Sequence, residues 1–163
     1  MKSLILGFAA VLFSSGLALA YPSLHDSVVF TGTVSEGAQS VQITFGMSLE
    51  QYDAAQQQYL KQQTITVSGG QPQSQTAWIK EADLMNPSKV QEVLSTCASY
   101  RGRLEDVTSG AETFHTCALP VNNENENSTY WVADIPFGIV RADILSLKNN
   151  THTVLLIKSH TGR

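Results

Sequence analysis

The stretch WVADIPFGIVRADILSL, residues 131–147, decides how the fold is interpreted. Its two halves are rich in β-branched and aromatic residues, which is typical of strands, and Pro136-Phe137-Gly138 separates them. A proline cannot donate a ladder hydrogen bond and a glycine permits a bend, so the chain is not expected to continue here as one flat strand. We expect a corner at which the strand bends and the sheet curls toward a barrel. An ordinary loop between two strands is the alternative.

The apolar pattern after this break favours a β-bulge. One face carries Val140, Ala142 and Ile144, and the apolar positions then move to the other face at Leu145 and Leu147. A bulge adds one residue to a strand and so produces such a change of phase.

Upstream of this stretch, alternating segments predict two hairpins. Residues 41–49, VQITFGMSL, alternate apolar and polar side chains strictly, which indicates a strand with one buried face. Residues 28–34 are expected to pair with them across a short turn that contains a glycine. Residues 58–67 and 73–80 flank a segment with two glycines and a proline, which predicts a second tight reversal.

A single helix is expected. The segment NPSKVQEVLSTC, residues 86–97, has Asn86 at the N-cap, Pro87 at the first helical position, and apolar residues at helical spacing. The apolar stripe includes Cys97 and should therefore face the sheet. The glutamine-rich segment 52–63 is interpreted as a loop that enters a strand, although alanine and glutamine also favour a helix.

The remaining segments complete a meandering sheet. Strands are expected at residues 103–108, 112–121, 129–135, 139–147 and 151–160, joined by polar loops of hairpin length. Eight or nine short strands with one helix are typical of an antiparallel sheet rather than a parallel one. The sequence therefore predicts a mainly β (α+β) fold, a curved antiparallel sheet or open half-barrel with one short helix covering its concave side.

The first twenty residues predict export. Lys2 precedes an apolar run, and Ala18-Leu19-Ala20 has the small-x-small pattern that a signal peptidase accepts. We expect residues 1–20 to be a cleaved signal peptide and residues 21–163 to form a single β-rich domain of 143 residues, 163 minus 20. An uncleaved anchor is the alternative, although the apolar run is short for a membrane span. The mature chain would be periplasmic or extracellular.

Cys97 and Cys117 are the two cysteines of the chain. In an oxidising compartment such a pair usually forms a disulfide. The bond would close a loop of twenty residues, and loop closure of this size stabilises a fold by roughly 3 kcal/mol. It would also fix the end of the helix to the strand face that carries Cys117, Leu119 and Val121. A metal site that uses His115 is the alternative, but Cys-x-x-Cys spacing is absent.

Three segments within residues 108–157, TSGAETFHTCAL, YWVADIPFGIVRADI and VLLI, resemble a pattern in uncharacterised exported bacterial proteins. In that pattern a Gly-x-x-Phe turn opens a strand, and a strand with a tryptophan ends in Pro-Phe-Gly-Ile-Val-Lys. Those proteins are similar to the periplasmic lipoprotein carriers. The resemblance therefore implies an open half-barrel closed by helices, with an apolar cavity for acyl chains. This chain differs from the pattern at Ala111-Glu112 and has Arg141 where lysine is usual.

The composition excludes several classes of partner and chemistry. Without residues 1–20 the chain has nine basic residues, ten less Lys2, against fourteen acidic ones, a net charge of −5. No basic stripe exists, so we expect neither nucleic acid nor an anionic membrane surface as a partner. No other segment approaches transmembrane length, so an integral membrane protein is not expected. The acidic segment NNENENS, residues 122–128, is interpreted as a solvated hairpin tip rather than a calcium site.

No motif for catalysis is present. The four histidines are scattered, and neither Gly-x-Ser-x-Gly nor a glycine-rich phosphate loop occurs. We therefore expect no enzyme activity, metal or cofactor.

Aromatic side chains remain as candidates for ligand binding, because pockets are mostly apolar with a few polar groups. Trp131 and Phe137 flank the expected corner, and Trp78, Tyr100 and Tyr130 complete the set. Plain core packing is the alternative role for all five. We expect an exported, non-enzymatic binding domain that holds a hydrophobic or amphipathic, lipid-like ligand in the concave face of the sheet. The alternative is a cell-envelope or secreted interaction module that binds another envelope protein and no small molecule.

Overall fold

A computed structural model describes residues 19–20, 23–85 and 87–162 of the chain. The expected signal peptide lies outside these residues except for Leu19–Ala20, and so does the expected N-cap Asn86. Signal peptide cleavage and the single mature domain remain predictions. The strands are β1 (Leu19–Ala20), β2 (Ser27–Glu36), β3 (Gln39–Asp53), β4 (Gln58–Val67), β5 (Gln73–Lys80), β6 (Leu84–Met85), β7 (Arg103–Ser109), β8 (Glu112–Asn122), β9 (Glu126–Val132), β10 (Ile139–Ser146) and β11 (Thr151–Thr161). The helices are α2 (Pro87–Ser95) and two short 3-10 helices, η1 (Glu81–Asp83) and η2 (Cys97–Tyr100).

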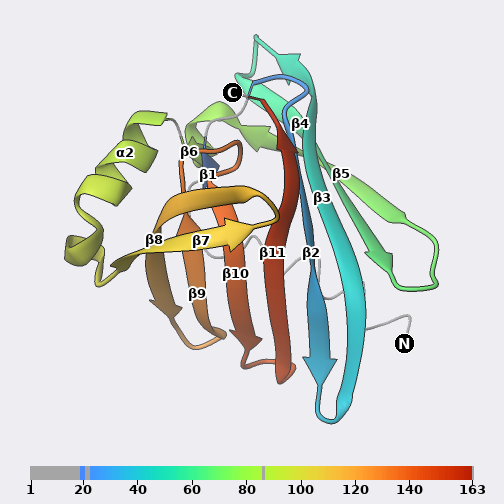
Figure 1. Ribbon diagram of the computed structural model, residues 1–163. Coiled ribbons are helices and arrows are strands. Elements are labelled where there is room, and N and C mark those ends of the chain that lie inside the picture. The colour runs from blue at the N-terminus through green and yellow to red at the C-terminus, as the bar shows by residue number, and fades with distance from the viewer. Residues whose placement is uncertain (1–18, 21–22, 86, 163) are drawn as a thin grey trace.

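Nine strands form one open sheet in the order β5-β4-β3-β2-β11-β10-β9-β8-β7, and every neighbouring pair is antiparallel (Figure 1). The short strands β1 and β6 form a separate parallel pair. The sheet does not close into a barrel, because its edge strands β5 and β7 do not pair with each other. The expected mainly β fold with one α-helix is confirmed for the described part of the chain. Strands β4 and β5 begin and end at the residues expected from the sequence.

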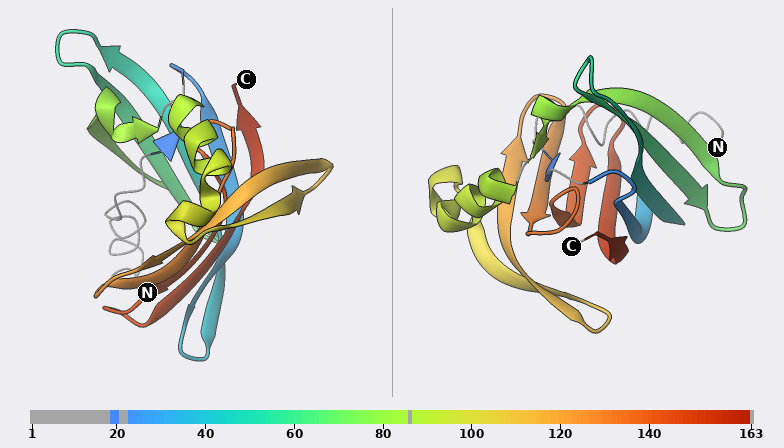
Figure 2. Two further views of the ribbon diagram at one scale, coloured as in Figure 1. Left: turned by 90° about the vertical axis from the view of Figure 1, so that its left-hand side faces the viewer. Right: turned by 90° about the horizontal axis from the view of Figure 1, so that it is seen from above.

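The sheet curls in opposite directions at its two ends (Figure 2). Strands β9, β10, β11 and β2 form a central row. The β4–β5 hairpin curls to one side of that row, and the β7–β8 hairpin folds over the other side. The tip of the β7–β8 hairpin reaches β11, where the Ser109 hydroxyl donates a hydrogen bond to the Ile157 carbonyl. The sequence predicted the curvature but not this second curl.

We call the side toward which β4 and β5 curl the inner face. Cross-strand register places Phe30 opposite Phe45, and Phe45 opposite Ile65, so these side chains share that face. The alternation in β2, β3 and β4 buries every second residue there, because successive residues of a strand point to opposite faces. Other apolar members of the inner face are Val28, Val34, Ile43, Met47, Leu49, Ala142, Ile144, Leu155 and Ile157.

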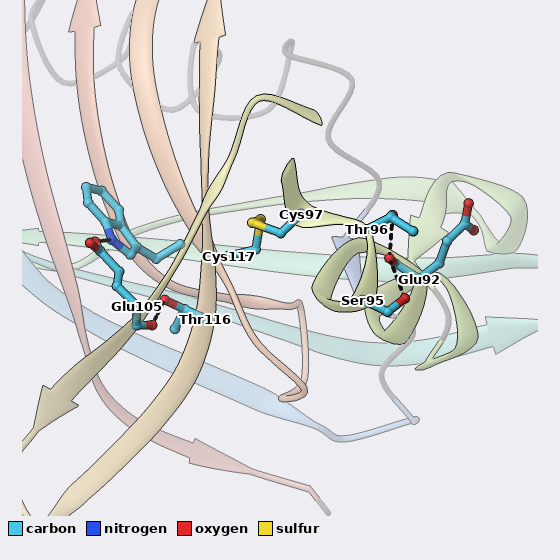
Figure 3. The surroundings of a disulfide bond; sticks show 8 residues. Glu92, Ser95, Thr96, Cys97, Glu105, Thr116 and Cys117 are labelled. Atoms are coloured by element: carbon cyan, nitrogen blue, oxygen red, sulfur yellow. Dashed lines mark hydrogen bonds between the residues drawn. A yellow bond between two sulfur atoms is a disulfide. The ribbon is translucent and has the colours of Figure 1, made fainter. Parts of the chain in front are cut away.

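Helix α2 packs on the inner face at the β8–β9 end of the sheet. Val90 of the helix is fully buried in a small cluster that also contains Leu119 and Val132. The disulfide between Cys97 and Cys117 belongs to the same cluster, with the two Cα atoms 5.8 Å apart (Figure 3). The expected bond and the expected orientation of the helix are therefore both confirmed.

Polar side chains end the helix directly before the disulfide. The hydroxyls of Ser95 and Thr96 donate hydrogen bonds to the Glu92 carbonyl, at 3.0 and 2.7 Å (Figure 3). The same carbonyl also accepts the Thr96 N–H at 2.9 Å, so three donors meet at one carbonyl of the last helical turn. The chain then enters η2, which carries Cys97.

The Pro-Phe-Gly segment is a turn between two strands, so the expected corner within one strand is wrong. Strands β9 and β10 run antiparallel to each other on either side of residues 133–138. The Gly138 N–H donates to the Ile135 carbonyl at 2.9 Å, and Phe137 has a φ of 63°. A type II turn typically has a proline at its second position and a residue with positive φ at its third position. The alternative of a loop between two strands is therefore correct.

The expected change of apolar phase in β10 is also wrong. Burial alternates without interruption through Val140, Ala142, Ile144 and Ser146, and Leu147 is half exposed in the following turn. The irregularity lies earlier, between Ile139 and Arg141 in the pairing with β9. The sequence suggested a slip because the buried position after Ile144 is occupied by a serine instead of an apolar residue.

The glutamine-rich segment forms no helix. Strand β3 continues to Asp53, and four turn residues lead into β4 at Gln58. The Asp53 carboxylate accepts a hydrogen bond from the Ala55 N–H at 2.9 Å, which stabilises the turn. The expected loop that enters a strand is confirmed.

Candidate functional site

Two polar side chains of β4 are buried on the inner face. Lys61 is paired with Leu49 and Gln63 with Met47, both fully or nearly fully buried residues of the apolar core. Lys61 is 6% exposed and Gln63 is 7% exposed. On the neighbouring strand, the Gln75 side-chain amide donates a hydrogen bond to the Gln63 Oε1 at 3.0 Å. The inner face therefore contains a polar position that is surrounded by apolar side chains of β3.

The electrostatics of this position are unusual. Burial lowers the pKa of the Lys61 ammonium below its ordinary value, because removal from water disfavours the charged form. The Gln63 Nε2 is buried and has no hydrogen-bond partner among the residues that the structure describes. Burying an amide donor without a partner costs roughly 1–3 kcal/mol, so such groups call for an explanation.

A second set of buried polar side chains lies at the far end of the same face, on β9, β10 and β11. The Tyr130 hydroxyl donates a hydrogen bond to the Glu126 Oε1 at 2.6 Å. The Ser128 hydroxyl is buried, and no partner for it lies in the described part of the chain. Glu126 is 3% exposed and begins β9, so the expectation of a solvated tip over all of residues 122–128 is wrong. Only residues 123–125 form the tip. The other members of this set are Ser146, Thr151 and Thr153.

Sequence reasoning missed these inner-face polar residues. The signal that could have found them is their phase along the strand. Lys61 and Gln63 alternate in step with Ile65, and Glu126 and Ser128 alternate in step with Tyr130. A polar residue that keeps the phase of the apolar ones must share their buried face.

Trp131 lies on the opposite face of the sheet, beneath the folded β7–β8 hairpin. Its indole N–H donates a hydrogen bond to the Glu105 carboxylate, and the Arg141 guanidinium lies 4.4 Å from the ring centroid. Arg103 forms an ion pair with the same carboxylate. The Trp131 hydrogen bond is the main cause that holds the pKa of Glu105 below its ordinary value. This arrangement fixes the hairpin against the sheet and leaves the indole 8% exposed.

The five aromatic candidates do not gather at one cavity mouth. Tyr130 and Trp131 are successive residues of β9 and point to opposite faces. Phe137 is fully buried in the main core. Trp78 lies on the edge strand β5, 50% exposed, and Tyr100 lies in η2 before the other edge strand, 48% exposed. Of the five, Tyr130 faces the inner surface, and a role of any of them in ligand binding remains a prediction.

Two histidines pair with exposed carboxylates. His115 lies 3.0 Å from Asp106, and His152 lies 2.7 Å from Asp143, in both cases with exposed side chains. Within residues 19–20, 23–85 and 87–162, no group of three or more His, Cys, Asp or Glu side chains is arranged to hold a metal ion. In the same part of the chain no helix has the length and apolar character needed to span a membrane.

A hollow of about 300 Å³ lies at the β2–β3–β4 end of the sheet. Its threonines, Thr31, Thr44 and Thr66, are cross-strand neighbours on the face opposite to Lys61. Among the described residues that line it, none is acidic, basic or a cysteine. It offers hydroxyl and amide groups for hydrogen bonding but no acid, base or strong nucleophile for catalysis.

Comparison with known proteins identifies a similar fold. No family model matches the chain, and no curated protein matches it. The chain is similar to a Bacteroides fragilis protein described as exported and as having a YmcC-like fold, with a TM-score of 0.50 at 11% identity. That similarity covers 88% of this chain and 99% of the other. It confirms the expected resemblance in fold to an exported bacterial protein.

Two further solved structures are more distant. The Pseudomonas aeruginosa MucA/MucB complex has a TM-score of 0.44 at 10% identity, over 83% of this chain and 51% of the other. A LolA superfamily protein from Nitrosomonas europaea has a TM-score of 0.23 at 9% identity, over 89% of each chain. At these scores neither carries an argument about this protein.

Proposed function

We propose that this protein is an exported, non-enzymatic binding domain that holds a hydrophobic or amphipathic, lipid-like ligand against the inner face of its sheet. The observation that carries the proposal is the composition of that face. A wide apolar surface around Phe30, Phe45 and Leu155 also contains buried polar groups without partners on Gln63 and Ser128. A closed core would avoid such groups, whereas a binding face uses a few polar groups to orient its ligand.

The position of the helix supports the same proposal. Helix α2 and the Cys97–Cys117 disulfide pack against Leu119 and Val132, at one end of the inner face. The apolar surface continues over β10, β11, β2 and β3, beyond the cluster that contains the helix. An extended apolar surface of this kind is suited to an alkyl chain.

The proposed location is outside the cytoplasm, in the periplasm or the extracellular medium. The small-x-small motif that ends at Ala20 and the disulfide both fit an oxidising, exported environment. The structurally similar Bacteroides fragilis protein is described as exported. We assign no catalysis, because the described residues that line the hollow between β2, β3 and β4 include no acid, base or strong nucleophile.

The test is native mass spectrometry of the mature protein purified from its own host, combined with titration of an environment-sensitive apolar dye. We expect a co-purifying lipid, or dye binding that a lipid displaces. Phe45→Lys would place a charge in the middle of the inner face and should reduce this binding. Thr76→Lys, on the exposed edge strand, is its control and should leave the binding unchanged. A lipid-free protein that binds no dye would refute the proposal.

Strand β5 supports a second candidate function, binding to another envelope protein. It is an edge strand of eight residues, all but Ile79 exposed, and it presents the half-exposed Trp78. An unpaired edge can accept a strand from a partner. Crosslinking in the host would test this function. Trp78→Ser should remove a crosslinked partner, whereas Tyr100→Ser, at a similarly exposed position, should not.

A further inference from the structure

Lys61 and Gln63 are neighbours on the inner face and both present hydrogen-bond donors. They are two residues apart on β4, so their side chains point the same way. The Gln63 Oε1 already accepts a hydrogen bond from Gln75, which orients the amide and leaves the Nε2 as the group without a partner. The ammonium of Lys61 has donors only. Together the two side chains therefore suit a ligand group that accepts hydrogen bonds.

We propose that Lys61 and Gln63 bind the anionic head group of an amphiphile, a carboxylate or a phosphate, whose apolar part lies on the inner face. The inference rests on the proposed function and adds the head-group class and its position. An anion at this site would give the buried Gln63 donor a partner and would accept a charge-assisted hydrogen bond from the Lys61 ammonium.

The surroundings of the site fit such a ligand. Leu49 and Met47 lie directly opposite Lys61 and Gln63 on β3, and Phe45 follows in the next row of the face. An alkyl chain attached to a head group at Lys61 would therefore meet apolar side chains at once. The second set of buried polar side chains, on β9, β10 and β11, contains the Glu126 carboxyl, which accepts a hydrogen bond from Tyr130. A carboxyl that acts as an acceptor does not suit an anionic ligand. These differences place the head group at β4 and not at β9.

The experiment is displacement of an environment-sensitive apolar dye from the mature protein by amphiphiles of one chain length. Dodecanoate and dodecyl phosphate carry the anionic head group, and dodecanol and dodecylamine do not. Acetate and inorganic phosphate test the head group without its chain. We expect both anionic amphiphiles to bind at least about tenfold more tightly than dodecanol, as charge-assisted hydrogen bonds in a desolvated site predict. Acetate and inorganic phosphate should not displace the dye at the same concentrations.

Two variants localise the effect. Lys61→Met keeps the apolar stem without the charge, and Gln63→Met removes the amide at similar volume. Each should reduce the preference for dodecanoate over dodecanol, with dodecanol affinity unchanged. Each should also fold, because it replaces a buried polar group with an apolar one, and circular dichroism checks this. Lys158→Met, at an exposed position of β11, and Glu126→Gln are controls that should leave the preference intact.

The outcomes separate this inference from the proposed function. If neither the dye nor any of the amphiphiles binds, the proposed function fails. If dodecanol and dodecylamine bind as tightly as dodecanoate, or if Lys61→Met and Gln63→Met leave the preference unchanged, the head-group site is wrong while the proposed function stands. Displacement by inorganic phosphate alone would show a simple anion site and would likewise overturn the inference.

Discussion

Gly102 and Cys117 are packed so closely that a Cβ atom on Gly102 would lie 2.6 Å from the Cys117 Sγ. The same atom would lie 2.7 Å from the Cys97 Sγ and 2.9 Å from a methyl carbon of Leu119. The Gly102 N–H donates a hydrogen bond to the Cys97 carbonyl at 2.9 Å. Only a residue without a side chain fits between the disulfide and β8, so Gly102 sets how closely the segment after the helix approaches the sheet.

Gly102→Ala should therefore destabilise the protein by about 1–3 kcal/mol, the usual cost of overpacking a filled site. Chemical denaturation of the oxidised protein measures this cost. Gly46→Ala is the matched control, because the nearest atom to its Cβ would lie 3.9 Å away. In a Cys97→Ala/Cys117→Ala background the Gly102→Ala cost should become smaller, since the two sulfur atoms are gone. An equal cost in both backgrounds would show that the close approach is not the cause.

Loss of the disulfide should lower the free energy of unfolding by about 2–4 kcal/mol, because the twenty-residue loop is no longer closed in the unfolded chain. Comparison of Cys97→Ala/Cys117→Ala with the wild type by denaturant unfolding gives this value. Thiol titration of the denatured, unreduced wild type should find no free thiol. Two free thiols per chain would contradict the bond.

Trp131→Phe should raise the pKa of Glu105 toward its ordinary value of 4.5, because the indole N–H is the main group that stabilises the ionised carboxylate. The aromatic ring remains for the Arg141 contact. Titration of the Glu105 carboxyl carbon by NMR measures the change directly. Trp78→Phe, which changes an exposed indole on β5, should leave this pKa unaltered.

The same hydrogen bond predicts how stability depends on pH. Because the pKa of Glu105 is lower in the folded protein, the unfolded chain binds more protons once the pH falls below about 4.5. The stabilisation from Glu105 is thus complete above that pH and is lost as the pH falls through the folded pKa. Trp131→Phe should lose less stability than the wild type over this acidic range. Denaturant unfolding of both proteins at neutral and acidic pH measures this. If the wild type and Trp131→Phe lose the same free energy of unfolding between the two pH values, the linkage is contradicted.

Phe137→Ala should destabilise the protein by about 3–5 kcal/mol, as expected for truncation of a fully buried aromatic side chain. Phe137 has a positive φ, which disfavours any residue with a Cβ except where packing compensates. Thermal and denaturant unfolding measure the cost, and Phe114→Ala, at a partly exposed position, should cost less. A cost below that of Phe114→Ala would show that Phe137 does not anchor the turn.

The sequence predicted the strands, the hairpins, the helix and the disulfide, because each depends on local pattern. Strict alternation over residues 41–49 specifies a strand with one buried face wherever that strand lies. The glycines and proline between β4 and β5 specify a reversal from backbone conformation alone. Cys97 and Cys117 were the only pair available to an exported chain.

Tertiary structure decided what local pattern leaves open, namely which face is covered and by which element. The Pro-Phe-Gly segment permits a corner or a turn, and the pairing of β9 with β10 selects the turn. Tyr130 and Trp131 are equally aromatic, but one faces the inner surface and the other the folded hairpin. Lys61 and Gln63 look like solvated residues by their type, but both are buried on the inner face. The phase of these residues along β4 is a local signal that places them on the apolar face, but long-range packing decides that this face is buried.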